Sequence, residues 1–133
     1  PFVTPLPQDK LFTHCHVVSL HCPLTPQNAG FVDAGLLHRC RPGLVLINTA
    51  RGRLVDDEAV ASALRDGRLG AYCADVLSEE PPRPCHPLLS APRAYLTPHI
   101  AWATLEARER LMQVVSANIA AFLAGKPQNV VSA

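Results

Sequence analysis

Three side chains that could do chemistry together lie near the ends of three separate apolar segments. Arg51 stands in a short loop of small residues, Glu80 precedes two prolines, and His99 follows Pro98. A histidine can give or take a proton near neutral pH, and a nearby carboxylate stabilises its charged form. The planar guanidinium of an arginine grips a carboxylate with two hydrogen bonds. This set of residue types could bind a small anionic substrate and move a proton to or from it.

Each of these three residues also has a purely structural interpretation. Arg51 could pair at the surface with Asp56 or Asp57, which we otherwise interpret as residues at a helix start, where carboxylates complement the helix dipole. Glu80 could be a solvated loop charge, and His99 could be a half-buried structural imidazole. The chemical interpretation therefore depends on whether the fold brings the three residues together.

Short apolar segments alternate with helical patterns along the chain. Continuous apolar runs predict buried strands at residues 16–20, 44–47, 70–77 and 94–97. Helices are predicted at residues 28–41, 58–66 and 105–124. The last helix should bury a stripe made of Leu111, Val114, Val115, Ile119, Phe122 and Leu123. Prolines exclude regular structure from residues 1–10. The alternation predicts an α/β fold, a parallel sheet with helices on both faces.

Polar residues follow all four predicted strands. Ligands of such sheets bind beyond the carboxyl ends of the strands. The residues found there are Cys22 and Pro23 after the first strand, Thr49, Ala50 and Arg51 after the second, Asp75 and Glu80 at the third, and His99 after the fourth. Asp75 would need a hydrogen bond if it is buried at a strand end. Convergence of polar groups on one edge of the sheet predicts an active site there.

The composition indicates an ordinary globular chain. The 133 residues are 48% hydrophobic and 17% charged, which excludes a disordered polypeptide. Twelve basic and eleven acidic side chains leave a net charge of +1, so we expect no nucleic-acid partner. No apolar run approaches the roughly 20 residues of a membrane span, and no targeting signal is found. We therefore expect a cytoplasmic protein without a membrane partner.

The five cysteines predict reduced thiols of the core rather than a metal site. Their number is odd and no pair has the spacing of a metal or redox motif. His14 and His16 flank Cys15, but alternation along a strand would turn the cysteine to the opposite face. We therefore predict that the chain binds no metal.

Four stretches of the sequence resemble the D-isomer-specific 2-hydroxyacid dehydrogenases. They are VVSLHCPLT at 17–25, RPGLVLINTARGRLVD at 41–56, ADVLSEEPP at 74–82 and LTPHIAWAT at 96–104. Within the family, residues 99–102 and 121–131 look most like bacterial glycerate dehydrogenases, also called hydroxypyruvate reductases. The resemblance implies an oxidoreductase that transfers hydride between NAD or NADP and a small D-2-hydroxy or 2-keto acid, such as glycerate, hydroxypyruvate or glyoxylate.

The resemblance also implies a role for each matching residue. Arg51 would bind the substrate carboxylate and the reactive carbonyl oxygen, His99 would protonate that oxygen, and Glu80 would pair with the histidine. The positions that would line the cofactor are Cys22, Pro23, Thr49, Ala50, Arg51, Asp75, His99 and Ala101.

One large departure from the family pattern is the lack of a Gly-x-Gly-x-x-Gly motif. The chain also opens with Pro1, and its single methionine is Met112. We therefore expect residues 1–133 to be the second half of a Rossmann-like, doubly wound nucleotide-binding domain, with four strands, flanking helices and a long C-terminal helix. The glycine-rich half and the substrate domain would be absent, and the fragment would be inactive alone. The complete protein would be a homodimer.

A second interpretation comes from a different class of protein. The C-terminal-binding corepressors use bound NAD mainly to control assembly, and they too carry a Pro-His followed by Ala-Trp. The absence of corepressor-like insertions favours the enzyme.

Overall fold

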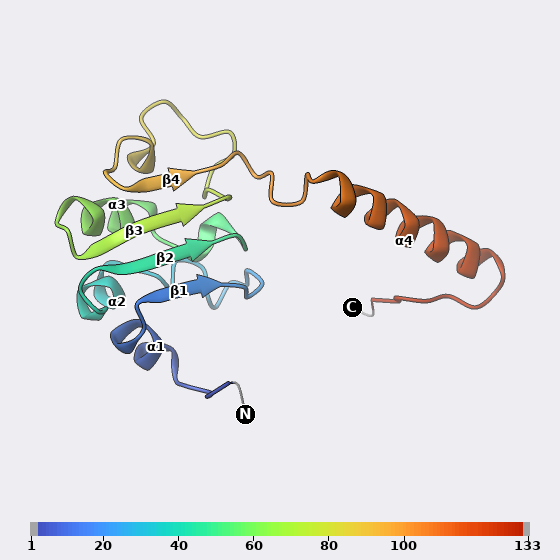
Figure 1. Cartoon of the computed structure of the whole chain (residues 1–133), viewed down its shortest axis with the longest axis horizontal. Coiled ribbons are helices and arrows are strands. Elements are labelled where there is room, and N and C mark those ends of the chain that lie inside the picture. Colours follow the sequence, from blue (N-terminus) through green and yellow to red (C-terminus); the bar gives the residue numbers. More distant parts are fainter. Residues whose placement is uncertain (1–2, 132–133) are drawn as a thin grey trace. The chain divides into compact units, whose positions relative to one another are not determined.

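The computed structural model describes residues 3–131, and the chain divides after His99 into two compact units. The first unit is built on one four-stranded sheet in which all neighbouring strands are parallel. Figure 1 shows the strands in the order β1 (Val17–Leu20), β2 (Leu44–Asn48), β3 (Leu69–Ala74) and β4 (Ala94–Leu96). The predicted α/β fold with four parallel strands is confirmed.

Three helices of the first unit connect or precede these strands. They are α1 (Gln8–His14), α2 (Ala34–Arg39) and α3 (Asp57–Arg65), with the 3₁₀ helices η1 (Gly52–Leu54) and η2 (Pro87–Leu89) in the loops. The prediction that residues 1–10 lack regular structure is wrong from Gln8 onward. Pro7 stands at the N-cap of α1, where the missing N–H of a proline removes no helical hydrogen bond.

Helix α2 is shorter than the predicted helix at 28–41. It begins only at Ala34, because the Asp33 carboxylate caps it by accepting a hydrogen bond of 2.7 Å from the Leu36 N–H. The residue just before the cap, Val32, is fully buried and forms a parallel bridge with Val55. Tertiary pairing therefore overrides the helical spacing of the apolar residues in this stretch.

One face of the sheet carries the core of the first unit. Side chains alternate along β1 and β2, so that Val18, Leu20, Leu44 and Leu46 are buried. They belong to one apolar cluster with residues of α2 and α3 such as Leu37, Val60 and Leu64. In Figure 1 these two helices lie behind the strands. Packing of the two helices on this face holds the strands in their places.

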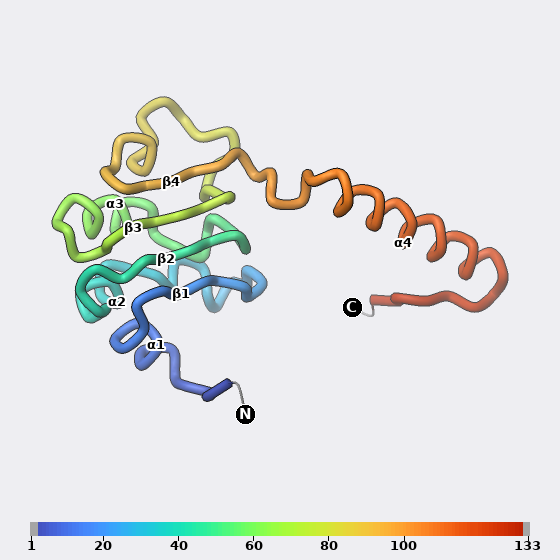
Figure 2. The backbone as a smooth tube through the Cα atoms, viewed as in Figure 1, coloured from blue at the N-terminus to red at the C-terminus, as the bar shows by residue number. Residues whose placement is uncertain are grey.

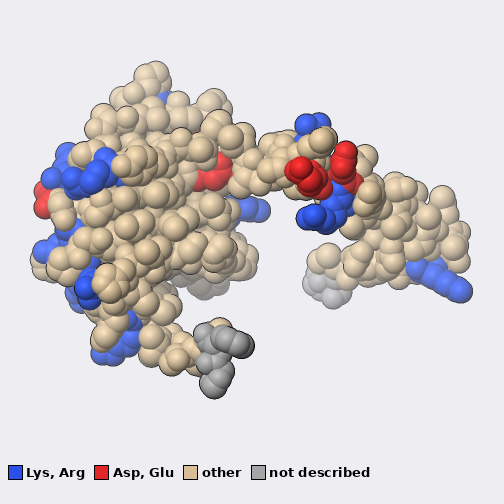
Figure 3. Space-filling model, viewed as in Figure 1, with Lys and Arg blue, Asp and Glu red and all other residues tan. Residues whose placement is uncertain are grey.

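The opposite face of the sheet is open. Val17 and Tyr95 are 53% and 62% exposed there, and Figure 3 shows hardly any charged side chain over the middle of this face. The predicted cover of helices on both faces is not found in residues 3–99. Short strands with apolar side chains on both faces favour two covers, but the periodicity does not say which part of a protein provides the second one.

The second unit contains α4 (Leu105–Leu123), which begins at the Thr104 cap and ends before Gly125. The predicted helix is confirmed, but the predicted burial of its apolar stripe is wrong. None of its described side chains is buried, and Phe122 and Leu123 are 71% and 79% exposed. An amphipathic pattern shows that a helix has an apolar side, and a second surface is still needed to cover it. None of the described helices is long and apolar enough to cross a membrane.

Candidate active site

The carboxyl ends of the four strands are aligned in one row. Leu20 lies beside Asn48, Asn48 beside Ala74, and Ala74 beside Leu96. The residues that follow each strand therefore emerge along one edge of the sheet. The candidate site residues were predicted at these positions, and the parallel register explains how Glu80 and His99, 19 positions apart in the chain, meet there.

His99 and Glu80 form an ion pair at this edge. The His99 Nδ1 lies 2.7 Å from Glu80 Oε2, and the other carboxylate oxygen, Oε1, accepts a hydrogen bond of 2.8 Å from the Leu77 N–H. The predicted contact between the two side chains is thus confirmed. The hydrogen bond from His99, assisted by that of Leu77 and opposed by partial burial, lowers the pKa of Glu80 below its usual value.

The backbone of His99 has an unusual conformation. Its φ angle is +55°, in the left-handed region, and its N–H donates a hydrogen bond of 3.0 Å to the Thr97 carbonyl. A non-glycine residue adopts this region only when its surroundings hold it there, and such residues gather at functional sites. Nothing in the sequence marked His99 for this conformation.

Arg51 lines the same cleft as Glu80 and His99. The cleft has a volume of about 230 Å³, and its walls come from the loops after β2 and β3 and from the turn after β4. The Arg51 Nη1 donates a hydrogen bond of 2.7 Å to the Ala50 carbonyl. Among the described residues Arg51 makes no ion pair, so the alternative of a surface pair with Asp56 or Asp57 is not found in residues 3–131.

The backbone of the Arg51 loop is fixed by a buried amide. The Asn48 Nδ2 donates a hydrogen bond of 2.9 Å to the Arg51 carbonyl, and Asn48 Oδ1 accepts one of 3.1 Å from the Ala50 N–H. A second hydrogen bond from Nδ2, of 3.3 Å, reaches the hydroxyl of Tyr72, whose pKa is raised by burial. Asn48 is fully buried, so these bonds are shielded from water.

Gly52 brings the Arg51 loop against the Glu80 loop. A Cβ atom on Gly52 would overlap the carbonyl of Leu77 and the backbone nitrogen of Ser78. Only a glycine therefore permits the two loops to approach this closely. This contact could not be predicted from the sequence, because a single Arg-Gly pair does not reveal what lies opposite.

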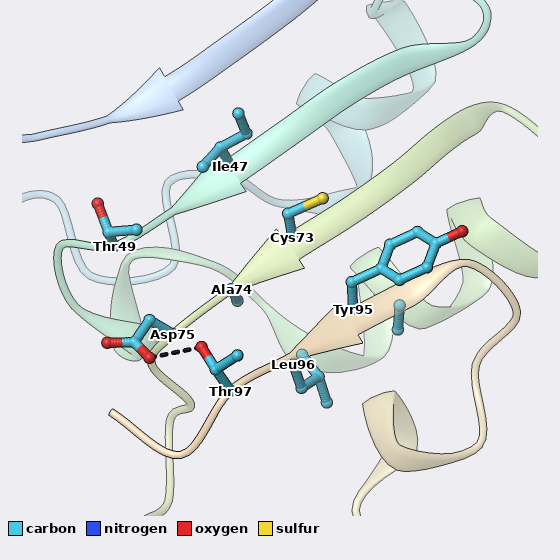
Figure 4. A pocket seen from close by; sticks show the side chains of 9 residues that line it. Ile47, Thr49, Cys73, Ala74, Asp75, Tyr95, Leu96 and Thr97 are labelled. Carbon is cyan, nitrogen blue, oxygen red and sulfur yellow. Dashed lines mark hydrogen bonds between the residues drawn. The ribbon is translucent and has the colours of Figure 1, made fainter. Parts of the chain in front are cut away.

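Asp75 and Thr97 line an open hollow of about 510 Å³ that lies alongside β2, β3 and β4. The Thr97 hydroxyl donates a hydrogen bond of 2.5 Å to the Asp75 carboxylate, which is buried, as predicted for a carboxylate at a strand end. Figure 4 shows this bond, with Thr49 at the end of the neighbouring strand and the side chain of Cys73 nearby. An apolar floor with a few hydroxyl and carboxylate oxygens suits the ribose and the flat ring of a nicotinamide cofactor.

The other predicted cofactor residues are placed differently. Cys22 and Pro23 follow β1, and Ala50 packs against the apolar core; none of the three is among the residues that line this hollow. Ala101 belongs to the second unit. The assignment of these four residues to the cofactor therefore stays a prediction.

No group of three or more side chains suited to a metal ion occurs among residues 3–131. The five cysteines are free thiols. Burial raises the pKa of Cys40, which lies in the core, whereas Cys85 is exposed in the loop before β4. The prediction that the cysteines are core thiols is therefore wrong for Cys85, which falls in a proline-rich loop and not in a strand.

A polar cluster around Asp57 could not be predicted from the sequence. Asp56 is the N-cap of α3 and Asp57 its first residue, as predicted for helix-start residues. Asp57 also accepts hydrogen bonds from the Ser78 hydroxyl and from His86. His86 lies 29 positions further along the chain, and no spacing rule links the two residues.

Comparison with known proteins identifies the family. The D-isomer specific 2-hydroxyacid dehydrogenase, NAD binding domain, matches residues 2–101. The chain is 44% identical over 127 residues to glycerate dehydrogenase of Methylorubrum extorquens and 39% identical over 124 residues to hydroxypyruvate reductase of Blautia hydrogenotrophica. The alignments cover 94% and 93% of this chain. The chain belongs to the D-isomer specific 2-hydroxyacid dehydrogenase family.

Solved structures agree with this assignment. The NAD-complexed D-isomer specific 2-hydroxyacid dehydrogenase from Lactobacillus delbrueckii ssp. bulgaricus superposes with a TM-score of 0.89 at 28% identity, covering 98% of this chain and 44% of that one. The chain spans only 40% and 38% of the lengths of the two curated relatives. The predicted family and its Rossmann-like nucleotide-binding fold are confirmed. The comparisons give the corepressor interpretation no support.

Proposed function

We propose that the whole protein carrying this chain is an NAD- or NADP-dependent D-2-hydroxyacid dehydrogenase. The substrates that we propose are glycerate and hydroxypyruvate, with glyoxylate as a second keto acid. The observation that carries this proposal is the His99–Glu80 ion pair, which shares one cleft with Arg51. The names of the two curated relatives support the choice of substrate. Homodimerisation of the complete protein and a cytoplasmic location stay predictions from the sequence.

In this proposal Arg51 binds the anionic end of the substrate. Arg51 is exposed and lines the cleft, and the Ala50 carbonyl that its guanidinium contacts is a weaker acceptor than a carboxylate. A keto acid entering the cleft would therefore replace that contact with a charge-assisted pair. Because the loop backbone is fixed by Asn48, the side chain can turn to the substrate while its Cα stays in place.

His99 is the proposed proton donor and acceptor. Its Nδ1 is engaged by the Glu80 carboxylate, so the second ring nitrogen, Nε2, is the atom that would exchange the proton with the substrate oxygen. The Glu80 carboxylate fixes the ring and stabilises the protonated imidazole. During reduction the proton passes from His99 to the developing hydroxyl group, and during oxidation it returns.

The cofactor would lie in the hollow lined by Thr49, Asp75 and Thr97. When bound, the nicotinamide supplies or receives the hydride. The Asp75 carboxylate can accept hydrogen bonds from hydroxyl groups in the hollow, while the apolar side chains of Ile47 and Cys73 exclude water from one side of it.

Substitutions of His99 and Arg51 in the whole protein test this function. We expect His99→Ala to lower kcat for hydroxypyruvate reduction by about 10²–10⁴-fold, since this is the usual contribution of a general acid. Arg51→Ala should mainly raise KM for the keto acid. His38→Ala, an exposed histidine of α2, is the matched control and should keep wild-type rates. Full turnover by the folded His99→Ala protein would overturn the assignment of the proton donor.

A further inference from the structure

The loop that carries Glu80 is tied to the start of α3 at two points. The Asp57 Oδ2 accepts a hydrogen bond from the Ser78 hydroxyl and lies 3.0 Å from the His86 Nε2. Ser78 and His86 stand on either side of Glu80 in the sequence. The two contacts therefore hold the loop from β3 to β4, which can be followed in Figure 2, both before and after the glutamate.

In the contact between His86 and Asp57, the histidine is the donor. The His86 Nδ1 accepts a hydrogen bond of 3.4 Å from the Leu88 N–H, so the proton of the neutral ring lies on Nε2 and is donated to Asp57. The side chains of His86 and Asp57 are only 5% and 10% exposed. The loop is thus held through a nearly dry contact, in which hydrogen bonds are stronger than at the surface.

The carboxylate of Asp57 is poorly suited to a purely stabilising role. Both hydrogen bonds go to Oδ2, whereas Oδ1 is buried and has no hydrogen-bond partner among the described residues. A buried carboxylate oxygen without a partner opposes folding. A carboxylate that occupies this position despite this cost is better explained by the geometry that its other oxygen imposes on Ser78 and His86.

We infer that Asp57 is a positioning residue, which holds the loop from Ser78 to His86 so that the Glu80 carboxylate stays in contact with His99. This inference rests on the proposed function, in which the Glu80–His99 pair serves proton transfer. The path is short, because Ser78 follows Leu77, whose N–H is bonded to the Glu80 carboxylate. A loosened Ser78 would therefore shift the backbone donor that orients Glu80.

Asp57 acts on the pair through geometry rather than through its charge. The pKa of Glu80 is lowered by the hydrogen bonds from His99 and Leu77 and is raised by the charge of Asp75, and Asp57 is not among its causes. A neutral side chain that keeps an acceptor oxygen in the place of Oδ2 should therefore replace Asp57. Asp57→Asn meets this condition, because its amide oxygen can take the place of Oδ2 and its amide nitrogen the place of the unpartnered Oδ1. Asp57→Ala removes the acceptor altogether.

The test compares these two variants in the whole protein, with hydroxypyruvate and the reduced nicotinamide cofactor that the wild type uses. We expect Asp57→Ala to lower kcat by about 10- to 10²-fold, as for other small misplacements of a catalytic group. KM should change little, since Arg51 lies on a different loop. Asp57→Asn should recover most of the rate. Asp56→Asn is the matched control, because Asp56 caps the same helix without touching the loop.

A double variant separates positioning from a general loss of structure. If Asp57 acts through Glu80, then Asp57→Ala should have almost no further effect on kcat in a Glu80→Gln background. The inference would be overturned if the kcat of the double variant were lowered by the product of the two single losses. A folded Asp57→Ala protein with the wild-type kcat would overturn it as well. Should Asp57→Ala not fold, Ser78→Ala, which changes an exposed residue and removes one of the two contacts, takes its place.

Carbon-13 NMR of the Glu80 carboxylate distinguishes failure of this inference from failure of the proposed function. Loosening of the loop should raise the pKa of Glu80 toward its ordinary value in Asp57→Ala but not in Asp57→Asn. If Glu80→Gln itself keeps the wild-type kcat, the role proposed for the Glu80–His99 pair fails, and a raised Glu80 pKa would still establish that Asp57 holds the loop. An unchanged Glu80 pKa in Asp57→Ala would refute the positioning role whatever the rates.

Discussion

The two loops that form the cleft are held in place by opposite means. The loop that carries Arg51 is fixed from within, by the Asn48 amide at the end of its own strand. The loop that carries Glu80 is fixed from outside, by Asp57 on a neighbouring helix. A buried amide with several partners specifies one backbone conformation, whereas two contacts to one carboxylate oxygen restrain the loop at its ends. Arg51 should therefore be the less sensitive of the two residues to changes elsewhere in the fold.

The largest effect is expected where the two loops touch. Gly52→Ala would place a methyl group into the backbone of Leu77 and Ser78, and backbone atoms give way less easily than side chains. We expect a loss of about 3 kcal/mol in the free energy of unfolding, the upper end for overpacking, together with a lower kcat, because both loops must shift. Urea denaturation and steady-state kinetics measure the two effects.

Gly35→Ala provides the matched control for that substitution. Gly35 lies in α2, and the nearest atom to an added Cβ is 3.3 Å away on the Asp33 side chain. Alanine is favoured over glycine within helices by about 0.5–1 kcal/mol, which offsets a small shift of the Asp33 side chain, so this variant should change the free energy of unfolding by less than about 1 kcal/mol. If Gly52→Ala proved equally harmless, the close approach of the two loops would be refuted.

A smaller effect is expected from removal of the buried amide. Asn48→Ala leaves the Ala50 N–H and the Arg51 carbonyl without their partner. We expect a loss of about 1–3 kcal/mol in the free energy of unfolding, the usual cost of unsatisfied buried groups. KM for the keto acid should rise more than kcat falls, since the substrate-binding loop is the one released. Gln113→Ala, an exposed amide of α4, is the control and should change neither quantity. An unchanged KM in Asn48→Ala would show that the Asn48 amide does not position the Arg51 loop, and the proposed difference between the two loops would be refuted.

The sequence predicted the position of the site better than the means that hold it together. The strands, their order along the chain and the polar residues after them follow from short-range patterns, so the meeting of Glu80 with His99 at one edge could be predicted. The Asp57–His86 contact could not, because it joins residues 29 positions apart whose types occur commonly in loops. The exposed apolar stripe of α4 shows the same limit, since periodicity identifies an apolar side without identifying what covers it.

The smallest effect on stability among these residues of the site is expected from the charge of Glu80. The His99–Glu80 pair is about half exposed, so Glu80→Gln should change the free energy of unfolding at neutral pH by about 1 kcal/mol or less. Because folding lowers the pKa of Glu80, its contribution is present above the ordinary glutamate pKa of about 4.3 and is lost as the pH falls through the lower value of the folded protein. The difference in unfolding free energy between wild type and Glu80→Gln should therefore shrink between about pH 5 and pH 3.

Glu79→Gln sharpens this measurement. Glu79 is the neighbouring carboxylate and pairs with Arg83 at 2.8 Å, but the Arg83 side chain is 75% exposed and neither residue contacts His99 in an ion pair. Its substitution should change stability by a few tenths of a kcal/mol and leave hydroxypyruvate reduction at the wild-type rate. Equal losses of activity in Glu79→Gln and Glu80→Gln would mean that negative charge in the loop matters and the individual pairing does not. A loss confined to Glu80→Gln would assign the effect to the one carboxylate that the loop presents to the imidazole.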